Sequence, residues 1–433
     1  MTAPSSASAG RSWSAALSRW LPTSRTSRRF VGISFIDAVG SGLFLAGAPL
    51  FFTRDLGLTV QQVGIGVSLS GLAGMLGLVP IGRLADRVGS KPTLVLLHLW
   101  RGLGFACYPF VHSAPMFFLL AFAIGIAEWS AAPSVQALVA SVEEGRARVR
   151  TMAAMGSIRN AGFTVGSLLA TLVIAFAPAG GYLAVVLVDA ASYFVAAWLL
   201  VRLAVPGRPP VTAPDGARPR RRFRLSDGRY LVFTGLNGVL YLHTVLLAVG
   251  LPLWIVTHTS APRALAAGLW VVNTAVVIVL QVPLSKGSDG ATPAARRQNW
   301  AAWSLAGCCL LVAVTGHLAA WPAGLLVLVA VVLLTLGEIW QSVGGWGISY
   351  AYAQPEQIGY YLSVYNLGLT AATIVGPVLV TFAVIQAGPL GWACLAAVFV
   401  GTGAAVRLCA RGASPAAVAD RTEPDPVGEA SQP

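Results

Sequence analysis

The sequence predicts an all-α membrane protein with twelve transmembrane helices arranged in two six-helix bundles. Apolar residues make up 56% of the chain and charged residues only 10%, less than half of the roughly 25% found in soluble domains. The mean hydropathy is +0.72. Apolar runs of about 18 residues or more, each long enough to cross roughly 30 Å of hydrocarbon, recur along the chain. None alternates with the two-residue period of a membrane barrel, so the runs are predicted to be helices.

The twelve helices follow from apolar runs that are bounded by glycine, proline or charged residues. In the first half these runs cover residues 30–52, 59–81, 93–112, 114–140, 151–178 and 180–203. In the second half they cover residues 229–257, 262–285, 299–318, 321–349, 359–384 and 387–408.

The predicted domains are therefore two bundles, residues 30–203 and 229–408, joined by a linker rich in proline and arginine at residues 204–228. Residues 1–29 are predicted to form a cytoplasmic tail, and residues 409–433 a disordered cytoplasmic tail.

The basic residues explain how the chain is expected to lie in the membrane. Of 29 Lys and Arg residues, 25 fall in the two tails, the linker and the loops that follow alternate helices. Because Lys and Arg stay on the cytoplasmic side of a membrane, both termini are predicted to be cytoplasmic, in a cell membrane. The same placement excludes nucleic acid as the partner that the net charge of +13 would otherwise indicate. The strong preference for arginine over lysine indicates a bacterial source.

Two short matches relate the halves to each other. "VPIGRLAD" at residues 79–86 matches "VPLSKGSD" at 282–289, and "SIRNAGFT" at 157–164 matches "SVYNLGLT" at 363–370. Both matches occupy equivalent places in the order of helices. They therefore predict a repeat with pseudo-two-fold symmetry.

A charged stretch, "GRLADRVGSKPTL", follows the second predicted helix. Gly82 and Gly89 permit close backbone approach and a tight turn. Asp86 can accept hydrogen bonds from a neighbouring helix end or from an arginine. Such a cluster can hold two bundles together in one conformation and release them in another. The alternative is a solvated loop whose charges only set the topology.

The stretch, together with twelve spans in two repeats, resembles the signature between the second and third helices of the major facilitator superfamily. The resemblance implies a cytoplasmic gating loop that stabilises the state open to the outside. The residues expected to act in this loop are Gly82, Arg83, Asp86, Arg87, Gly89 and Lys91. Leu84 also matches the family pattern but is not expected to take part in gating.

The first helix contains "GLFLAGAPLFF", which is similar to the corresponding stretch of twelve-span drug:proton exporters. Other marks of that group are missing. Many proton-coupled members carry an arginine in the fourth helix, and near the equivalent position, around Ala121, this chain has none. The antiporter signature of the fifth helix lacks its proline and keeps three glycines, Gly156, Gly162 and Gly166, whereas Gly376-Pro377 stands in the eleventh helix.

Six ionisable residues lie inside the predicted helices, where each costs roughly 2.5–3.5 kcal/mol at the membrane centre and so needs a partner or a function. They are Asp37, Arg101, Glu128, Arg159, Asp189 and Glu338. Four acids against two bases leave two carboxylates without a counter-ion, and a carboxyl group in a low dielectric takes up a proton more readily than in water.

The resemblance sorts these six, because helices 1, 4, 7 and 10 of the family line the cavity. It implies that Asp37, Glu128 and Glu338 serve proton coupling or substrate binding, together with Arg159 on the interface helix 5. Arg159 is expected to pair with Asp37 or Glu128 until movement of the halves breaks the pair. Arg101 and Asp189 fall on support helices, where a structural pair is expected.

Two tryptophans, Trp129 and Trp340, each neighbour an intramembrane glutamate and are candidates for an aromatic cavity wall. The alternative for each is an anchor at the membrane surface. The five cysteines have no metal-ligand spacing, and no nucleophile, base or phosphate loop occurs at a useful spacing, so neither an enzyme nor a cofactor is expected.

These observations favour a proton-coupled exporter of a small, largely apolar molecule that works by alternating access as a monomer in the lipid bilayer. A uniporter or importer of a sugar or metabolite remains an alternative, since the antiporter proline is missing. A transporter-like receptor or scaffold is a third alternative, although it would need neither a gating loop nor unpaired acids.

Overall fold

The computed structural model describes residues 21–22, 24–176, 181–205, 228–288 and 290–410. Most of both predicted tails and of the predicted linker lies outside these ranges, as does Asp289 of the repeat match.

Six helical segments build the first half of the described chain. The first is α2 (Arg25–Leu50), which continues as the π-helix η1 (Phe51–Asp55). Next come α3 (Val60–Val88), α4 (Ser90–Cys107) with the short 3-10 helix η2 (Tyr108–Phe110), α5 (Ala114–Val142), α6 (Arg146–Phe176) and α7 (Gly181–Arg202).

The second half of the described chain repeats this order. Its first segment is broken into α8 (Gly228–Tyr241), α9 (His243–Val245), the π-helix η3 (Leu246–Gly250) and α10 (Leu251–His258). It is followed by α11 (Leu265–Leu284), α12 (Ala291–Thr315), α13 (Ala320–Tyr352), the 3-10 helix η4 (Pro355–Gln357), α14 (Ile358–Leu379) with the π-helix η5 (Val380–Ile385), and α15 (Pro389–Ala410).

Nine of these described segments are long and apolar enough to cross a membrane. The other three are the segments of α4, α11 and α12. The apolar part of α11, Gly268–Leu284, is shorter, while α4 carries Lys91 and Arg101, and α12 carries Arg296 and Arg297. The all-helical architecture of twelve segments agrees with the prediction.

The predicted gating loop is not a loop. The helix α3 continues to Val88, so that Gly82, Arg83, Asp86 and Arg87 lie on its last turns, and α4 begins at Ser90. Only Gly89 separates the two helices, with a φ of 101° that a glycine adopts without strain. The prediction failed because charged residues end an apolar run in the sequence but do not end a helix that reaches beyond the hydrocarbon.

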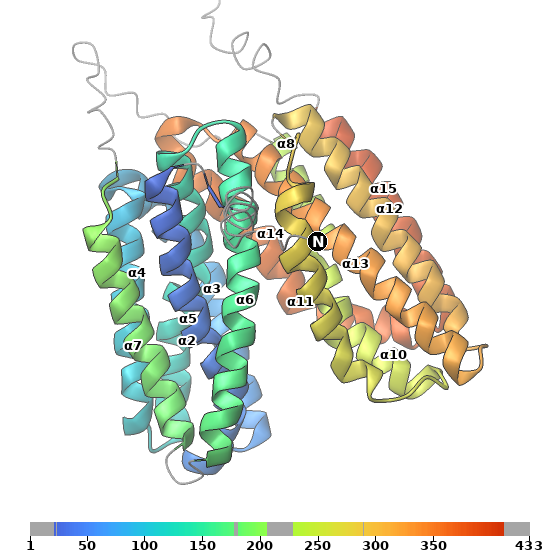
Figure 1. Cartoon of the computed structure of the whole chain (residues 1–433), viewed down its shortest axis with the longest axis horizontal. Coiled ribbons are helices and arrows are strands. Elements are labelled where there is room, and N and C mark those ends of the chain that lie inside the picture. Colours follow the sequence, from blue (N-terminus) through green and yellow to red (C-terminus); the bar gives the residue numbers. More distant parts are fainter. Residues whose placement is uncertain (1–20, 23, 177–180, 206–227, 289, 411–433) are drawn as a thin grey trace, which may run out of the picture.

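Six helices begin at the same end of the bundles: α2, α4, α6, α8, α12 and α14. We call this the basic end. Figure 1 shows the two bundles close together at this end and diverging toward the opposite end. Side chains link the halves there. The amide of Asn366 on α14 donates to Gln136 Oε1 on α5 at 2.9 Å, and Tyr350 Oη on α13 donates to the Gln136 carbonyl at 3.0 Å. Gly156 on α6 packs against Gln281 on α11.

Within the first bundle, α2 and α6 pack backbone to backbone through glycines. A Cβ atom added to Gly166 would overlap the carbonyl oxygen of Val39 and lie 2.8 Å from the amide nitrogen of Leu43. Small residues let membrane helices approach closely, and van der Waals contact then holds them together. Gly166, which the sequence presents as the remnant of an antiporter signature, therefore has a packing role.

We expect Gly166→Ala to lower the free energy of unfolding by about 1–3 kcal/mol, because the new methyl group forces α2 and α6 apart. Thermal unfolding in detergent measures the effect. Gly32→Ala on α2 is the matched control, since no atom lies within 4 Å of its added Cβ, and it should leave stability unchanged or raise it by up to about 1 kcal/mol. Equal melting temperatures for both variants would contradict the packing role.

Candidate functional site

Arg101 of α4 is the centre of a buried ionic cluster in the first bundle. Its Nε lies 2.6 Å from Glu128 Oε2 and its Nη2 lies 3.0 Å from Glu128 Oε1, a two-point pairing with α5. Its Nη1 lies 3.2 Å from Asp37 Oδ1 on α2. One guanidinium group is therefore shared between two carboxylates from two other helices.

Tyr193 of α7 completes the surroundings of this guanidinium group. Arg101 Nη2 donates to the Tyr193 hydroxyl at 2.8 Å, and the Arg101 Cζ lies 4.0 Å from the centre of the tyrosine ring. The hydroxyl also lies 3.2 Å from Ser41 Oγ of α2. Arg101 is only 3% exposed, so these contacts replace its hydration.

His98, one turn before Arg101, can become a second cation in the cluster. Its Nδ1 lies 2.9 Å from the carbonyl oxygen of Leu94, where it can only donate. Its Nε2 lies 3.6 Å from Asp37 Oδ1. A proton on Nε2 would complete an ion pair with Asp37, whereas an unprotonated Nε2 would place a lone pair toward the carboxylate.

Asp189 of α7 is fully buried, and neither of its carboxylate oxygens has a hydrogen-bond partner among the described residues. It packs against α2 at Gly40, where an added Cβ would lie 2.8 Å from Asp189 Oδ1. An unpaired carboxylate in such a place is costly in its charged form. The cluster thus holds three carboxyl groups around one arginine, and protons can balance the excess negative charge.

The predicted ion pair of Arg159 with Asp37 or Glu128 is not formed in this arrangement, although Arg159 lies within electrostatic reach of Asp37. Arg159 forms no hydrogen bond or ion pair with any described residue, and its Cζ lies 5.6 Å from the centre of the Phe163 ring. Arg101, expected to be a purely structural residue, holds both acids. All of these groups lie at similar depth, so only the rotation of each helix decides which base meets the acids.

In the second bundle, Glu338 of α13 has no cation within ion-pair distance among the described residues. It accepts one hydrogen bond, at 2.7 Å, from the amide of Asn273 on α11, which also donates to Thr335 Oγ1 at 3.0 Å. Tyr241 of α8 lies within electrostatic reach of both Glu338 and Arg159. Charges of opposite sign from the two halves therefore approach the same tyrosine.

The two candidate tryptophans contact neighbouring helices. The Trp129 ring lies against Gly74 of α3. The Trp340 ring meets Trp300 of α12 edge-on at 5.6 Å, and its indole nitrogen is buried without a partner among the described residues. Within the same residues, no group of three or more His, Cys, Asp or Glu side chains is placed to hold a metal ion.

Asp86 joins the halves at the basic end. Its carboxylate accepts hydrogen bonds from the backbone N–H groups of Gly359 at 2.7 Å and Tyr360 at 2.9 Å, in the first turn of α14. The N–H groups at the start of a helix are available to an outside acceptor, and the positive end of the helix dipole favours a carboxylate. The prediction that Asp86 accepts hydrogen bonds from a neighbouring helix end is confirmed.

The other residues of the predicted gate take different places. A Cβ on Gly82 would lie 2.6 Å from the carbonyl oxygen of Gly359, so this glycine permits α3 to contact α14. Arg83 Cζ lies 5.2 Å from the centre of the Tyr360 ring. Lys91 instead works within the first bundle, where its Nζ donates to the Val201 and Leu203 carbonyls at 3.0 and 2.8 Å. Arg87 is exposed.

We expect Asp86→Ala to favour separation of the halves at the basic end, because two charge-assisted hydrogen bonds to α14 are lost. A loss of about 1–2 kcal/mol would change the ratio of closed to open molecules roughly 5- to 30-fold. Spin labels at the exposed positions Val88 and Glu356 would report this as a longer distance. Arg87→Gln is the control that should leave the distance distribution unchanged; an identical distribution for Asp86→Ala would refute the contact's role.

We expect Arg101→Gln to destabilise the protein by about 3 kcal/mol, because it leaves the buried Asp37 and the partly exposed Glu128 without their cation. Adding Glu128→Gln should recover part of this loss, since one of the two stranded carboxylates is then neutral. Unfolding in detergent measures both variants. Arg159→Gln, which loses no ion pair to a described residue, should cost about 1 kcal/mol or less. Equal losses for Arg101→Gln and Arg159→Gln would speak against the shared pairing.

Comparison with known proteins identifies the kind of molecule that carries these features. Residues 30–377 match the family model described as the Major Facilitator Superfamily. A solved structure described as a Major Facilitator Superfamily transporter, FucP, in the outward conformation is similar over 90% of this chain and 98% of its own, with a TM-score of 0.68 and 16% sequence identity. At that identity the likeness concerns the fold.

Two characterised proteins are similar in sequence over shorter segments. The sugar transporter ERD6-like 6 of Arabidopsis thaliana is 28% identical over 130 residues, which are 29% of this chain and 25% of that protein. The multidrug resistance protein MdtH of Salmonella arizonae is 22% identical over 264 residues, which are 60% of this chain and 58% of that protein. The matched segments thus span from a quarter to less than two thirds of these relatives.

Proposed function

Because the chain belongs to the Major Facilitator Superfamily, and is therefore a multi-pass membrane transporter and not an enzyme, we propose that it exports a small, largely apolar molecule in exchange for protons. The halves would alternate between two arrangements around a site midway along the helices. We propose that the basic end faces the cytoplasm, since Lys and Arg collect on that side of a membrane.

The observation that carries proton coupling is the excess of carboxyl groups around Arg101. The Glu128 side chain is 41% exposed and the Asp37 side chain 9%, so in this proposal Glu128 is the acid that exchanges protons with the cavity. A proton that arrives on Glu128 would weaken its pairing with Arg101 and leave the guanidinium group to Asp37. A change of protonation would thus become a change in the contacts among α2, α4 and α5.

The contacts at the basic end describe one of the two arrangements in this cycle. Asp86 holds α3 to the first turn of α14, and Gln136 holds α5 to α13 and α14. If the basic end is cytoplasmic, this arrangement is closed to the cytoplasm. In this proposal Glu338 and Arg159 face the transported molecule, because neither has an ionic partner among the described residues.

Transport in vesicles tests the proposal. We expect cells with the protein to accumulate less of an exported compound, and a proton uncoupler to abolish the difference. Asp37→Asn, Glu128→Gln and Glu338→Gln should each remove the uncoupler-sensitive part of transport, whereas Asp55→Asn, an exposed acid at the opposite end, should not. Proton-driven transport that survives all three substitutions would exclude coupling through these acids.

A uniporter or importer of a sugar or metabolite is the second candidate function. The similarity of 130 residues to a sugar transporter favours it, as does the missing proline of the antiporter signature. It predicts higher accumulation in cells that contain the protein, with no effect of the uncoupler on a uniporter.

A further inference from the structure

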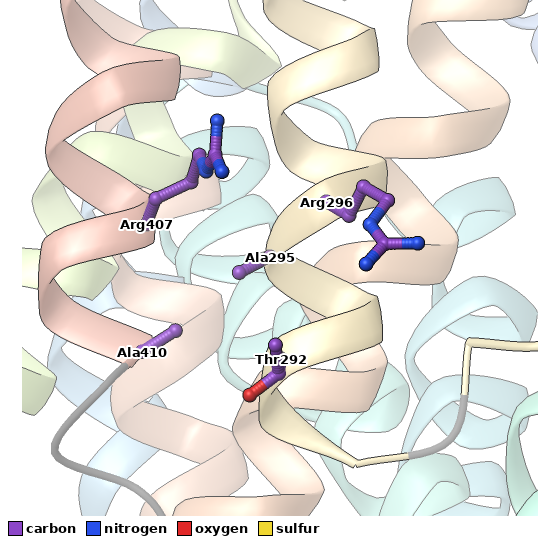
Figure 2. A pocket seen from close by; sticks show the side chains of 5 residues that line it. All are labelled: Thr292, Ala295, Arg296, Arg407 and Ala410. Carbon is purple, nitrogen blue, oxygen red and sulfur yellow. The ribbon is translucent and has the colours of Figure 1, made fainter.

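The outer surface of the second bundle contains a basic pocket at the basic end, away from the candidate transport site. It lies between the start of α12 and the end of α15, is lined by Thr292, Ala295, Arg296, Arg407 and Ala410, and has a volume of about 150 Å³. Figure 2 shows Thr292, Ala295 and Arg296 on α12, and the Arg407 side chain extending from α15 toward α12.

Both arginines of this pocket are exposed, and neither forms a hydrogen bond or an ion pair with a described residue. The neighbouring Arg297 differs, because its Nη2 donates to the Lys286 carbonyl at 2.6 Å and its Cζ lies 4.5 Å from the centre of the Trp300 ring. Figure 2 shows the Arg407 guanidinium group between the two helices and the Arg296 guanidinium group turned away from α15. Arg296 is exposed, so rotation of its side chain can bring it to the pocket beside Arg407. A guanidinium group offers several donors to an anion, and its planar form suits a phosphate.

Large apolar side chains are exposed on the same two helices, close to the pocket in sequence. Trp300 and Trp303 on α12 are 40% and 60% exposed, and Leu408 on α15 is 64% exposed. Large exposed apolar side chains pack favourably against acyl chains, and tryptophans are enriched at the level of the lipid head groups. The pocket is smaller than the roughly 300–1,000 Å³ of sites for drug-sized molecules, so it suits a head group better than a whole transported molecule.

The first bundle explains why the space exists. Gly89 and Gly290 precede α4 and α12 with positive φ angles of 101° and 83°, so Lys91 and Thr292 are both the second residue of their helix. The Lys91 amine reaches the last carbonyls of α7, the helix that packs on α4. At the corresponding place between α12 and α15, the shorter Thr292 leaves a pocket.

We propose that this pocket binds the phosphate of an anionic phospholipid head group, with Arg296 and Arg407 as its cationic ligands and the acyl chains lying along the apolar faces of α12 and α15. Basic pockets between membrane helices on the cytoplasmic side bind anionic head groups in this way. The site is separate from Arg101 and Glu338, and it does not depend on which molecule is transported.

Native mass spectrometry of the detergent-purified full-length protein tests the proposal by titrating phosphatidylglycerol, phosphatidylcholine and free glycerol phosphate. We expect saturable binding of phosphatidylglycerol and much weaker binding of the other two. Replacing both arginines (Arg296→Gln with Arg407→Gln) should weaken binding about 30-fold, and each alone roughly 5-fold, at about 1 kcal/mol for each arginine. Arg54→Gln with Arg263→Gln, two exposed arginines at the opposite end, is the matched control and should have no effect.

The variant Thr292→Lys distinguishes binding inside the pocket from general electrostatic attraction to a basic surface. If lysine occupies the space as Lys91 does in the first bundle, phosphatidylglycerol binding falls although a positive charge is added. Stronger binding by Thr292→Lys, equal loss in the control variant, unchanged binding after loss of both pocket arginines, or glycerol phosphate binding as tightly as the lipid would each overturn the proposal. Unchanged melting temperatures confirm that the exposed substitutions leave the fold intact.

Discussion

A charge that is carried into a bilayer must find its partner inside the protein, and this requirement organises the first bundle around Arg101. Water cannot solvate the guanidinium group there, so Glu128 and Asp37 balance its charge and Tyr193 accepts a hydrogen bond from it, each from a different helix. The same requirement makes the arrangement sensitive to protons. When several acids share one cation, their pairings with it differ little in free energy. A single proton on one acid then changes which acid pairs with the cation.

The two bundles share a helix order but satisfy their polar groups by different chemistry. The second bundle has a neutral network in its core, where Gln298 and Gln341 both donate to Asn237 Oδ1 at 2.9 Å and all three residues are fully buried. Amides that bind each other hold α8, α12 and α13 in place without a net charge. This part of the second bundle therefore keeps its contacts whatever the protonation state of the Arg101 cluster.

The contact between the halves belongs to a third type. Asp86 binds backbone N–H groups of α14, and a backbone group has no alternative charge state. The contact requires a close approach of α3 and α14, which Gly82 and Gly359 permit. It suits a joint that forms in one arrangement of the halves and is lost in the other.

Several features were accessible from the sequence because they depend on composition and local spacing. Apolar length predicted the twelve helices, and the acid in the charged stretch after the second helix predicted that Asp86 can accept hydrogen bonds from a neighbouring helix end or from an arginine. The extent of α3 was missed, because charge ends an apolar run while the backbone hydrogen bonds of the helix continue to Val88. The pocket between α12 and α15 joins residues more than a hundred positions apart, and no local pattern marks it.

The sequence by itself determined that six ionisable groups enter the membrane and that the acids outnumber the bases. The helix ends in the structure place four of these groups at a similar distance from the basic end. Counted from the basic end of each helix, Arg101 is 11 residues from Ser90, Asp37 is 12 from Arg25, Arg159 is 13 from Arg146, and Glu128 is 14 from Val142.

Only the tertiary structure decided that Arg101 meets the acids and Arg159 does not. The depth of a residue in the membrane follows from the number of residues between it and the end of its helix. Pairing depends instead on how each helix is rotated and on which helices are neighbours. Those are set by packing over the whole length of the bundle, including the close glycine contacts of α2 with α6, and no single residue carries that information.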